Sequence, residues 1–204
     1  AALGLAGAAL QGLLRNPLAG PGVLGVSASS ALGAVIAIYF GWVAAGVLVV
    51  PAAAIIFAGG AMLALLAVSG RRPDTVRLIL VGVGLSSLAG ALTALAMNLA
   101  PTPFTLTDMV NWLLGSVTNR SWLDVLLVLP AWVAGAALVL LAGPGLRALS
   151  LGEETAITLG ADPARTRLLI IGGTSLLAGA SVGIAGTIGF VGVVAPHVVR
   201  PWCG

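Results

Sequence analysis

The residues that could carry chemistry are few, and they do not group into a catalytic or metal-binding pattern. His197 is the only histidine and Cys203 the only cysteine, so the sequence has no cysteine pair for a disulfide and no cysteine cluster for a metal. A lone histidine close to Arg200 is expected to be structural. All nine basic residues are arginine, so the sequence also lacks the lysine of a phosphate-binding loop. We therefore expect no catalytic residue, no metal ligand, no cofactor and no ATPase site.

The composition indicates that this chain is dissolved in a lipid bilayer. Of its 204 residues, 59% are hydrophobic and only 7% are charged, whereas about a quarter are charged in soluble domains. A transmembrane helix needs about 20 mainly apolar residues. The uncharged stretches are long enough for such helices, and they cover residues 16–70, 78–107, 125–146 and 168–199. Leu123–Leu141 lacks the alternation of a barrel strand, so we predict an all-α polytopic membrane protein with a single domain, residues 1–204.

The acidic residues lie at the ends of these stretches or between them. They are Asp74, Asp108, Asp124, Glu153, Glu154 and Asp162. Carriers driven by protons or ions usually place ionisable groups inside the membrane. Their positions here weaken the alternative of an ion-coupled secondary transporter.

The arginines predict the orientation. If successive connections alternate sides, eight arginines fall on one side and only Arg120 on the other, so the arginine-rich side is cytoplasmic. The net charge of +3 is then an orientation signal, and no nucleic-acid partner is expected. The sequence begins within one apolar segment and ends directly after another, so we expect a fragment. The expected segments are 1–14 inward, 24–41 outward, 44–68 inward, 77–99 outward, 122–142 inward, 166–186 outward and 189–203 inward.

Small residues recur at helical spacing in two of these segments. Such residues let transmembrane backbones approach closely, so they predict a tight bundle. The positions are Gly4, Gly7, Ala8 and Gly12 in one segment and Gly82, Ser86, Gly90 and Ala94 in the other.

The connection 101–121 is predicted to contain a short helix at the outer surface, at about 107–115. Thr107 or Asp108 can cap its start, and Gly115 can end it. Trp112 and Trp122 suit the membrane interface.

The connection 143–167 is predicted to contain a cytoplasmic helix. Gly143–Pro144–Gly145 is expected to end the preceding span. Ser150 and Glu153 fit a capping box, in which the serine caps the new helix and the glutamate bonds back to it. Gly160 can stop the helix. An ordinary loop helix resting on the membrane remains the alternative.

Further residues refine this prediction. Glu154 suits the positive end of a helix dipole, while Ala156 and Leu159 would give the helix a small apolar face. Asp162 followed by Pro163 predicts the start of the next helix, with aspartate as cap and proline at the first position.

Three motifs, in order and at the right spacing, resemble the FecCD family of permeases that import iron–siderophores, haem and vitamin B12. Trp112–Ser116 matches between them, and the resemblance covers the whole chain. One departure is Thr187, where the family commonly has proline. The motifs are Gln11–Val26, Leu149–Ala156 with Leu159–Gly160 and Arg165–Arg167, and Ala185–His197.

The resemblance implies the type II ABC importer transmembrane-domain fold, with about seven of its ten helices in this chain, truncated at both ends. It implies a multi-pass protein of the bacterial cytoplasmic (inner) membrane. The implied partners are two copies of a cytoplasmic ATP-binding subunit, a second permease protomer in a homo- or heterodimer, an extracytoplasmic substrate-binding protein and the transported chelate. An iron–siderophore is the expected substrate, with haem and cobalamin left open.

The resemblance also implies three sets of site residues. Coupling helices at about 149–165 would dock on the ATPase through Ser150, Leu151, Gly152, Glu153, Glu154, Ala156, Leu159 and Gly160. A cytoplasmic gate would lie near Asn16, Leu18, Thr75 and Val76. The translocation path would be lined by Ser86, Ser87, Thr93 and Asn98.

Two other functions remain open. Gly4–Gly7 with Pro17 is echoed at Gly183–Gly186 with Pro196, in segments of opposite direction. Inverted repeats occur in many transporters, so the echo is compatible with an ion-coupled secondary carrier. A purely structural membrane subunit is the other alternative.

Overall fold

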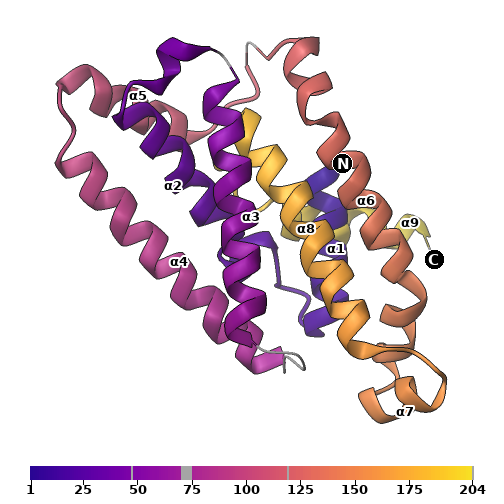
Figure 1. Ribbon diagram of the computed structural model, residues 1–204. Helices are drawn as coiled ribbons and strands as arrows, with labels where there is room; N and C mark the ends of the chain where they lie inside the picture. The colour runs from indigo at the N-terminus through magenta and orange to yellow at the C-terminus, as the bar shows by residue number, and fades with distance from the viewer. Residues whose placement is uncertain (47, 70–74, 119, 204) are drawn as a thin grey trace.

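The computed structural model describes residues 1–46, 48–69, 75–118 and 120–203, without the side chains of Ser69, Thr75 and Cys203. Within these ranges every regular element is a helix, which confirms the predicted all-α class (Figure 1). The elements are α1 Ala2–Leu14, η1 Pro21–Leu24, α2 Val26–Tyr39, η2 Trp42–Ala45, α3 Val49–Ser69, α4 Thr75–Asn98, α5 Pro103–Leu114, α6 Trp122–Ser150, α7 Glu153–Thr158, α8 Pro163–Ala185 and α9 Val191–Cys203.

Four helices among the described residues, α3, α4, α6 and α8, are long and apolar enough to cross a membrane. Helix α8 lies between α3 and α6 in Figure 1, with α1 behind it. It is also the central helix by burial, since 83% of its most apolar window is buried, against 28% or less in the other three. The outward faces of α3, α4 and α6 therefore remain apolar and available to lipid or to other helices.

Close approach of glycines explains how α8 occupies the centre. A Cβ atom at Gly173 would come 2.7 Å from the Gly135 carbonyl oxygen of α6, and one at Gly135 would come 2.8 Å from the Gly173 oxygen. Only hydrogens at both positions allow this backbone contact, which replaces the hydrophobic driving force absent between helices in lipid.

The small-residue pattern is partly confirmed in both helices: the glycines of α1 pack closely but Ala8 is exposed, and in α4 only some positions pack. In α1, a Cβ atom at Gly7 would overlap the Gly192 carbonyl oxygen of α9, and one at Gly12 would meet the Leu146 side chain. In α4, Gly82 lies against the backbone of η1 at Val23, whereas Gly90 faces open space.

Helix α6 does not end where the sequence suggested. The prediction that Gly143–Pro144–Gly145 terminates the span is wrong, because the helix continues through Pro144 to Ser150. Gly145 serves helix packing instead, since a Cβ there would overlap the Thr166 hydroxyl of α8. Proline is tolerated inside transmembrane helices because neighbouring groups satisfy the freed backbone carbonyl.

Helix α5 begins four residues before the predicted 107–115. Thr102 is the N-cap and its hydroxyl accepts a hydrogen bond of 3.1 Å from the Thr105 amide, so neither Thr107 nor Asp108 caps the helix. Pro103 at the first position favours this earlier start. Gly115 ends the helix with φ 68°, as predicted.

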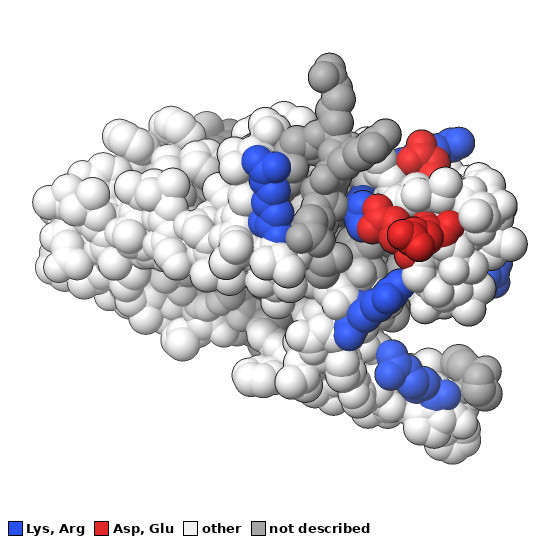
Figure 2. Space-filling view, turned by 90° about the horizontal axis from the view of Figure 1, so that it is seen from below, with Lys and Arg blue, Asp and Glu red and all other residues white. Residues whose placement is uncertain are grey.

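Charged side chains gather at the end of the bundle from which α7 projects, as Figure 2 shows. Arg77 lies in the first turn of α4, Arg147 in the last turn of α6, and Arg165 in the first turn of α8. This is the end that the sequence predicts to be cytoplasmic. Arg71, Arg72 and Asp74, which also entered that prediction, lie outside the described residues.

Candidate coupling and translocation sites

Helix α7 is a short, separate element between two glycines with positive φ. Gly152 is its N-cap with φ 119°, and Gly160, with φ 80°, follows the end of the helix. Such angles suit glycine because it has no Cβ to clash with the backbone. The chain can therefore reverse sharply on either side of α7 and present it beyond the bundle (Figure 1).

The predicted capping box at Ser150 and Glu153 is wrong. Ser150 is the last residue of α6, and its hydroxyl donates a 2.6 Å hydrogen bond to the Arg147 carbonyl. A serine with helical backbone cannot act as the N-cap of the next helix. A capping box does form at the start of α6, where Ser121 accepts from the Asp124 amide and the Asp124 carboxylate accepts from the Ser121 amide.

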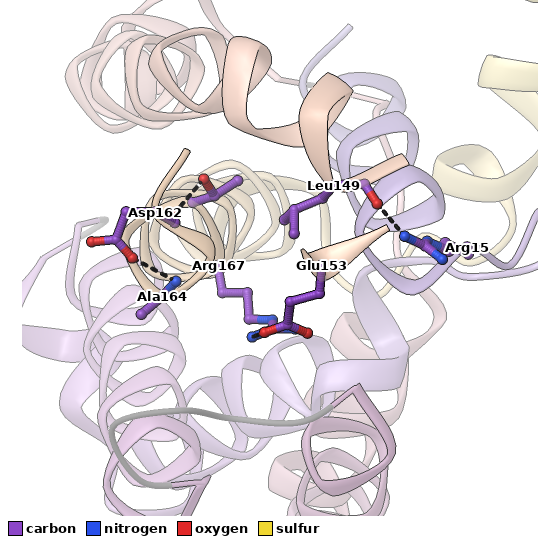
Figure 3. A network of polar contacts seen from close by, with 7 residues as sticks. Arg15, Leu149, Glu153, Asp162, Ala164 and Arg167 are labelled. Atoms are coloured by element: carbon purple, nitrogen blue, oxygen red, sulfur yellow. Dashed lines mark hydrogen bonds and ion pairs between the residues drawn. The ribbon is translucent and has the colours of Figure 1, made fainter. Parts of the chain in front are cut away.

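Glu153 makes a bidentate ion pair with Arg167 of α8 (Figure 3). The distances are 3.2 Å from Nη1 to Oε1 and 2.8 Å from Nη2 to Oε2. The Arg167 side chain is only 9% exposed, whereas that of Glu153 is 53% exposed. The pair therefore satisfies a buried guanidinium with a carboxylate that still contacts solvent.

The ion pair changes the ionisation of Glu153. Hydrogen bonding to Arg167 lowers the pKa of the Glu153 carboxyl below its usual 4.5, partly opposed by desolvation and aided by the charges of Arg167 and Arg15. A lowered pKa in the folded state means that the unfolded state binds protons more readily as pH falls. The stabilisation from this pair is thus complete above about pH 4.5 and declines as pH drops through the lowered value.

We expect Glu153→Gln to lower the free energy of unfolding by about 1 kcal/mol at pH 7, the upper end for pairs screened by water. Burial of Arg167 would make the loss of stability larger, but solvent screening of the exposed Glu153 carboxylate makes it smaller. The difference between variant and wild type should shrink below pH 4.5, because the wild-type carboxyl then becomes neutral as well. Unfolding in detergent, followed from pH 7 to pH 3, measures this, and a difference independent of pH contradicts the assigned ion pair.

A second arginine contacts the end of α6, from which the chain leads into α7. The Arg15 guanidinium, at the end of α1, donates to the carbonyl of Leu149 in the last turn of α6. A cation at a helix C-terminus is favourable because the carbonyl groups there carry partial negative charge. Figure 3 shows Arg15 and Arg167 on opposite sides of Glu153.

The remaining coupling residues divide into an inner and an outer set. Ala156 is completely buried, as the predicted apolar face requires, but Leu159 is 64% exposed and belongs to the other side. Leu151 and Ile157 are similarly exposed, at 67% and 58%. Ile157 was not among the predicted contact residues, because only Ala156 and Leu159 were expected to form the apolar face. Glu154 is exposed as well, so α7 and its two flanking leucines present three large apolar side chains beside a carboxylate.

The start of α8 agrees with the sequence. The Asp162 carboxylate accepts from the amides of Ala164 and Arg165 at 2.9 and 3.1 Å, and Pro163 is the first helical residue.

The predicted gate residues are only partly described. The Asn16 side chain accepts a 2.9 Å hydrogen bond from the Leu18 amide and stabilises the turn after α1. The Leu18 and Val76 side chains are exposed. The side chain of Thr75 lies outside the described residues.

The predicted path residues on α4 have different surroundings. Ser86 donates to the Gly22 carbonyl of η1 at 3.3 Å. The side chains of Thr93 and Asn98 bond carbonyls of their own helix, four residues earlier. Ser87 and Asn98 are both exposed, and eleven residues of an α-helix separate them by only about 20° around its axis. Ser86 therefore anchors α4, while Ser87 and Asn98 share an outward face.

Comparisons with known proteins agree with this fold. The FecCD transport family matches residues 1–204. The uncharacterized ABC transporter permease protein YvrB of Bacillus subtilis is 40% identical over 98% of this chain and 58% of its own length. The cobalamin import system permease protein BtuC of Halobacterium salinarum is 39% identical over 98% of this chain and 54% of its own. The ferric enterobactin transport system permease protein FepD of Escherichia coli is 38% identical, covering 98% and 60%.

A solved structure is similar over the whole of this chain. It is described as an inward-facing conformation of an ABC transporter assigned provisionally to the metal-chelate type. The TM-score is 0.91 and the sequence identity 33%, with 100% of this chain and 65% of the other covered. The chain spans 54–60% of the length of the three relatives named above. With the predicted type II importer fold thus confirmed, the chain belongs to the FecCD transport family and is a multi-pass protein of the inner membrane.

Proposed function

We propose that this chain is part of the permease subunit of an ATP-binding-cassette importer, which moves a metal chelate into the cytoplasm. A separate subunit would hydrolyse the ATP. The observation that carries the proposal is α7, which projects from the charged end of the bundle and is held there by the Glu153–Arg167 ion pair. The exposed apolar side chains of α7 and its flanking residues, Leu151, Ile157 and Leu159, suit a protein partner better than water.

The proposed partner on this face is the cytoplasmic ATP-binding subunit, present in two copies. Importers alternate between two arrangements of the helices. An ATP-binding subunit can shift the equilibrium between them only through contacts that differ between the two arrangements. A short helix between Gly152 and Gly160 can follow a moving partner. Glu154, exposed on the same element, supplies a charge that helps to orient the contact.

The proposed path runs along the outward face of α4, between this chain and a second permease protomer. Small or polar exposed residues follow one another at helical spacing on that face. They are Gly84, Ser87, Ala91, Ala94 and Asn98. A neutral surface of this kind suits a bulky chelate whose metal is already fully ligated, because no protein ligand is then required.

We propose an iron–siderophore as the chelate, delivered by an extracytoplasmic binding protein. The names of relatives span cobalamin, ferric enterobactin, ferric citrate and molybdate. Three relatives are named for an iron chelate and three for cobalamin or vitamin B12, so these names support an iron chelate and cobalamin equally, and each more than molybdate. The cytoplasmic gate is proposed near the turn Asn16–Leu18 and the start of α4 at Thr75 and Val76.

Cross-linking and uptake in vesicles test this proposal. With Ile157→Cys or Leu159→Cys in the full-length permease, we expect cross-links to the co-expressed ATP-binding subunit. Leu106→Cys, on α5 at the other end of the bundle, is the matched control and should give none. Ferric siderophore uptake should require ATP inside the vesicles. Uptake that continues without ATP and collapses with the ion gradient would instead indicate an ion-coupled carrier, and the absence of any uptake a structural subunit.

A further inference from the structure

Two arginines from different helices hold the segment that leads into α7. Arg167 comes from α8 and binds Glu153 at the first position of α7. Arg15 comes from the end of α1 and binds the carbonyl of Leu149, four residues before Glu153. The segment Leu149–Glu153 is therefore attached at both of its ends, to two different helices.

The backbone of Arg15 has a conformation that is unusual for a residue with a side chain. Arg15 has φ 48° and ψ 36°, one of two positive-φ residues other than glycine among the described residues. This left-handed conformation is costly for a side chain with a Cβ, and helices ending this way usually place glycine there. Here the arginine instead lets α1 end at Leu14 while its guanidinium reaches α6.

The contact also lies beside the proposed gate. Arg15 directly precedes Asn16, whose side chain caps the turn to Leu18 through the 2.9 Å hydrogen bond. A displacement of the α6–α7 junction thus acts through Leu149 on the residue next to that turn. The Leu149 carbonyl also accepts a 3.1 Å hydrogen bond from the Gly152 amide, so the arginine binds the same oxygen that closes the turn into α7.

We propose that Arg15 is a positioning residue that transmits the movement of α7 to the turn Asn16–Leu18, with the Glu153–Arg167 pair fixing α7 to α8. The proposal rests on the proposed function, because it requires α7 to be moved by an ATP-binding subunit. If Arg15 couples the two sites, its loss should lower the uptake achieved per ATP hydrolysed. Binding of the ATP-binding subunit and of the substrate should stay unchanged.

The test uses the full-length permease with its ATP-binding subunit in vesicles, and it measures ATP hydrolysis, ferric siderophore uptake and subunit association. Arg15→Met should leave association intact and lower the uptake per ATP hydrolysed by about fivefold or more. Arg15→Lys should recover most of the ratio, since an ammonium group can still donate to the Leu149 carbonyl. Arg147→Met removes an exposed arginine from the same end of α6 and should leave the ratio unchanged.

The outcomes separate this inference from the proposed function. An unchanged ratio in Arg15→Met, with association intact, overturns the role of Arg15 and leaves the docking of α7 standing. If Arg15→Met does not fold, Arg15→Gln tests the role of Arg15 instead. Glutamine keeps a polar side chain at this position, but its amide is too short to reach the Leu149 carbonyl. Wild-type vesicles that show no association with the ATP-binding subunit would overturn the proposed function itself, and this inference with it.

Discussion

Replacing Gly186 with alanine is expected to lower the free energy of unfolding by about 2–5 kcal/mol, the combined cost of backbone strain and overpacking. Gly186 has φ 72° and lies in the turn between α8 and α9. A Cβ atom there would overlap the Trp112 carbonyl oxygen and come 2.7 Å from the Gly115 Cα. Both neighbours are backbone atoms, so no side-chain rotation can relieve the clash.

The expected loss includes the attachment of α5. The Ser116 amide donates to the Ala185 carbonyl at 2.7 Å, and the Thr187 hydroxyl donates to the Leu113 carbonyl. These bonds join the end of α5 to the turn, and they depend on the approach that glycine allows. Thr187, where the resembled family commonly has proline, thus makes a side-chain hydrogen bond that proline could not make.

Gly189→Ala is the matched control, because it lies in the same turn and a Cβ atom there would meet nothing within 4 Å. Unfolding of both purified variants in detergent measures the difference. If Gly186→Ala and Gly189→Ala both have the same free energy of unfolding as the wild type, the close packing of α5 on this turn is wrong.

Most helices could be predicted because their signals are local. Uncharged stretches of sufficient length predicted α3, α4, α6 and α8, and lipid allows few other ways to satisfy a backbone. Asp162 and Pro163 predicted the start of α8, since a cap and a first-turn proline need only neighbouring residues.

The misassigned boundaries depended on contacts between distant residues. Ser150 and Ser121 both precede an acidic residue by three positions, yet only Ser121 forms a capping box. The difference arises because α6 continues through Pro144, where Gly145 packs against Thr166. Nothing in the local sequence around Ser150 reports that packing.

The arginine contacts at the coupling segment were also beyond sequence reasoning. Arg167 and Glu153 are 14 positions apart and belong to different helices, while Arg15 and Leu149 are 134 positions apart. The positive-inside pattern treated both arginines as orientation signals, and it cannot distinguish a cation at the membrane surface from one buried against a carboxylate. Three-dimensional placement was needed to separate these two roles.

Replacing Gly82 with alanine should detach α4 from η1 and cost about 3 kcal/mol, the upper part of the range for overpacking. A Cβ atom at Gly82 would overlap the Val23 carbonyl oxygen and come 2.8 Å from the Leu24 Cα. The neighbouring Ser86 donates to the Gly22 carbonyl, so the same displacement breaks the polar contact that anchors α4. If α4 lines the path as proposed, the variant should also lose uptake.

Gly84→Ala is the control for this prediction. Gly84 lies two residues further along α4, and a Cβ atom there would meet nothing within 4 Å. An alanine in place of an exposed helical glycine should raise stability slightly, by up to about 1 kcal/mol. The two substitutions should therefore change the free energy of unfolding in opposite directions, although they lie only two positions apart in one helix. Equal effects of the two substitutions on unfolding would mean that α4 is not held by the backbone of η1, and the path proposed along its outward face would lose its structural basis.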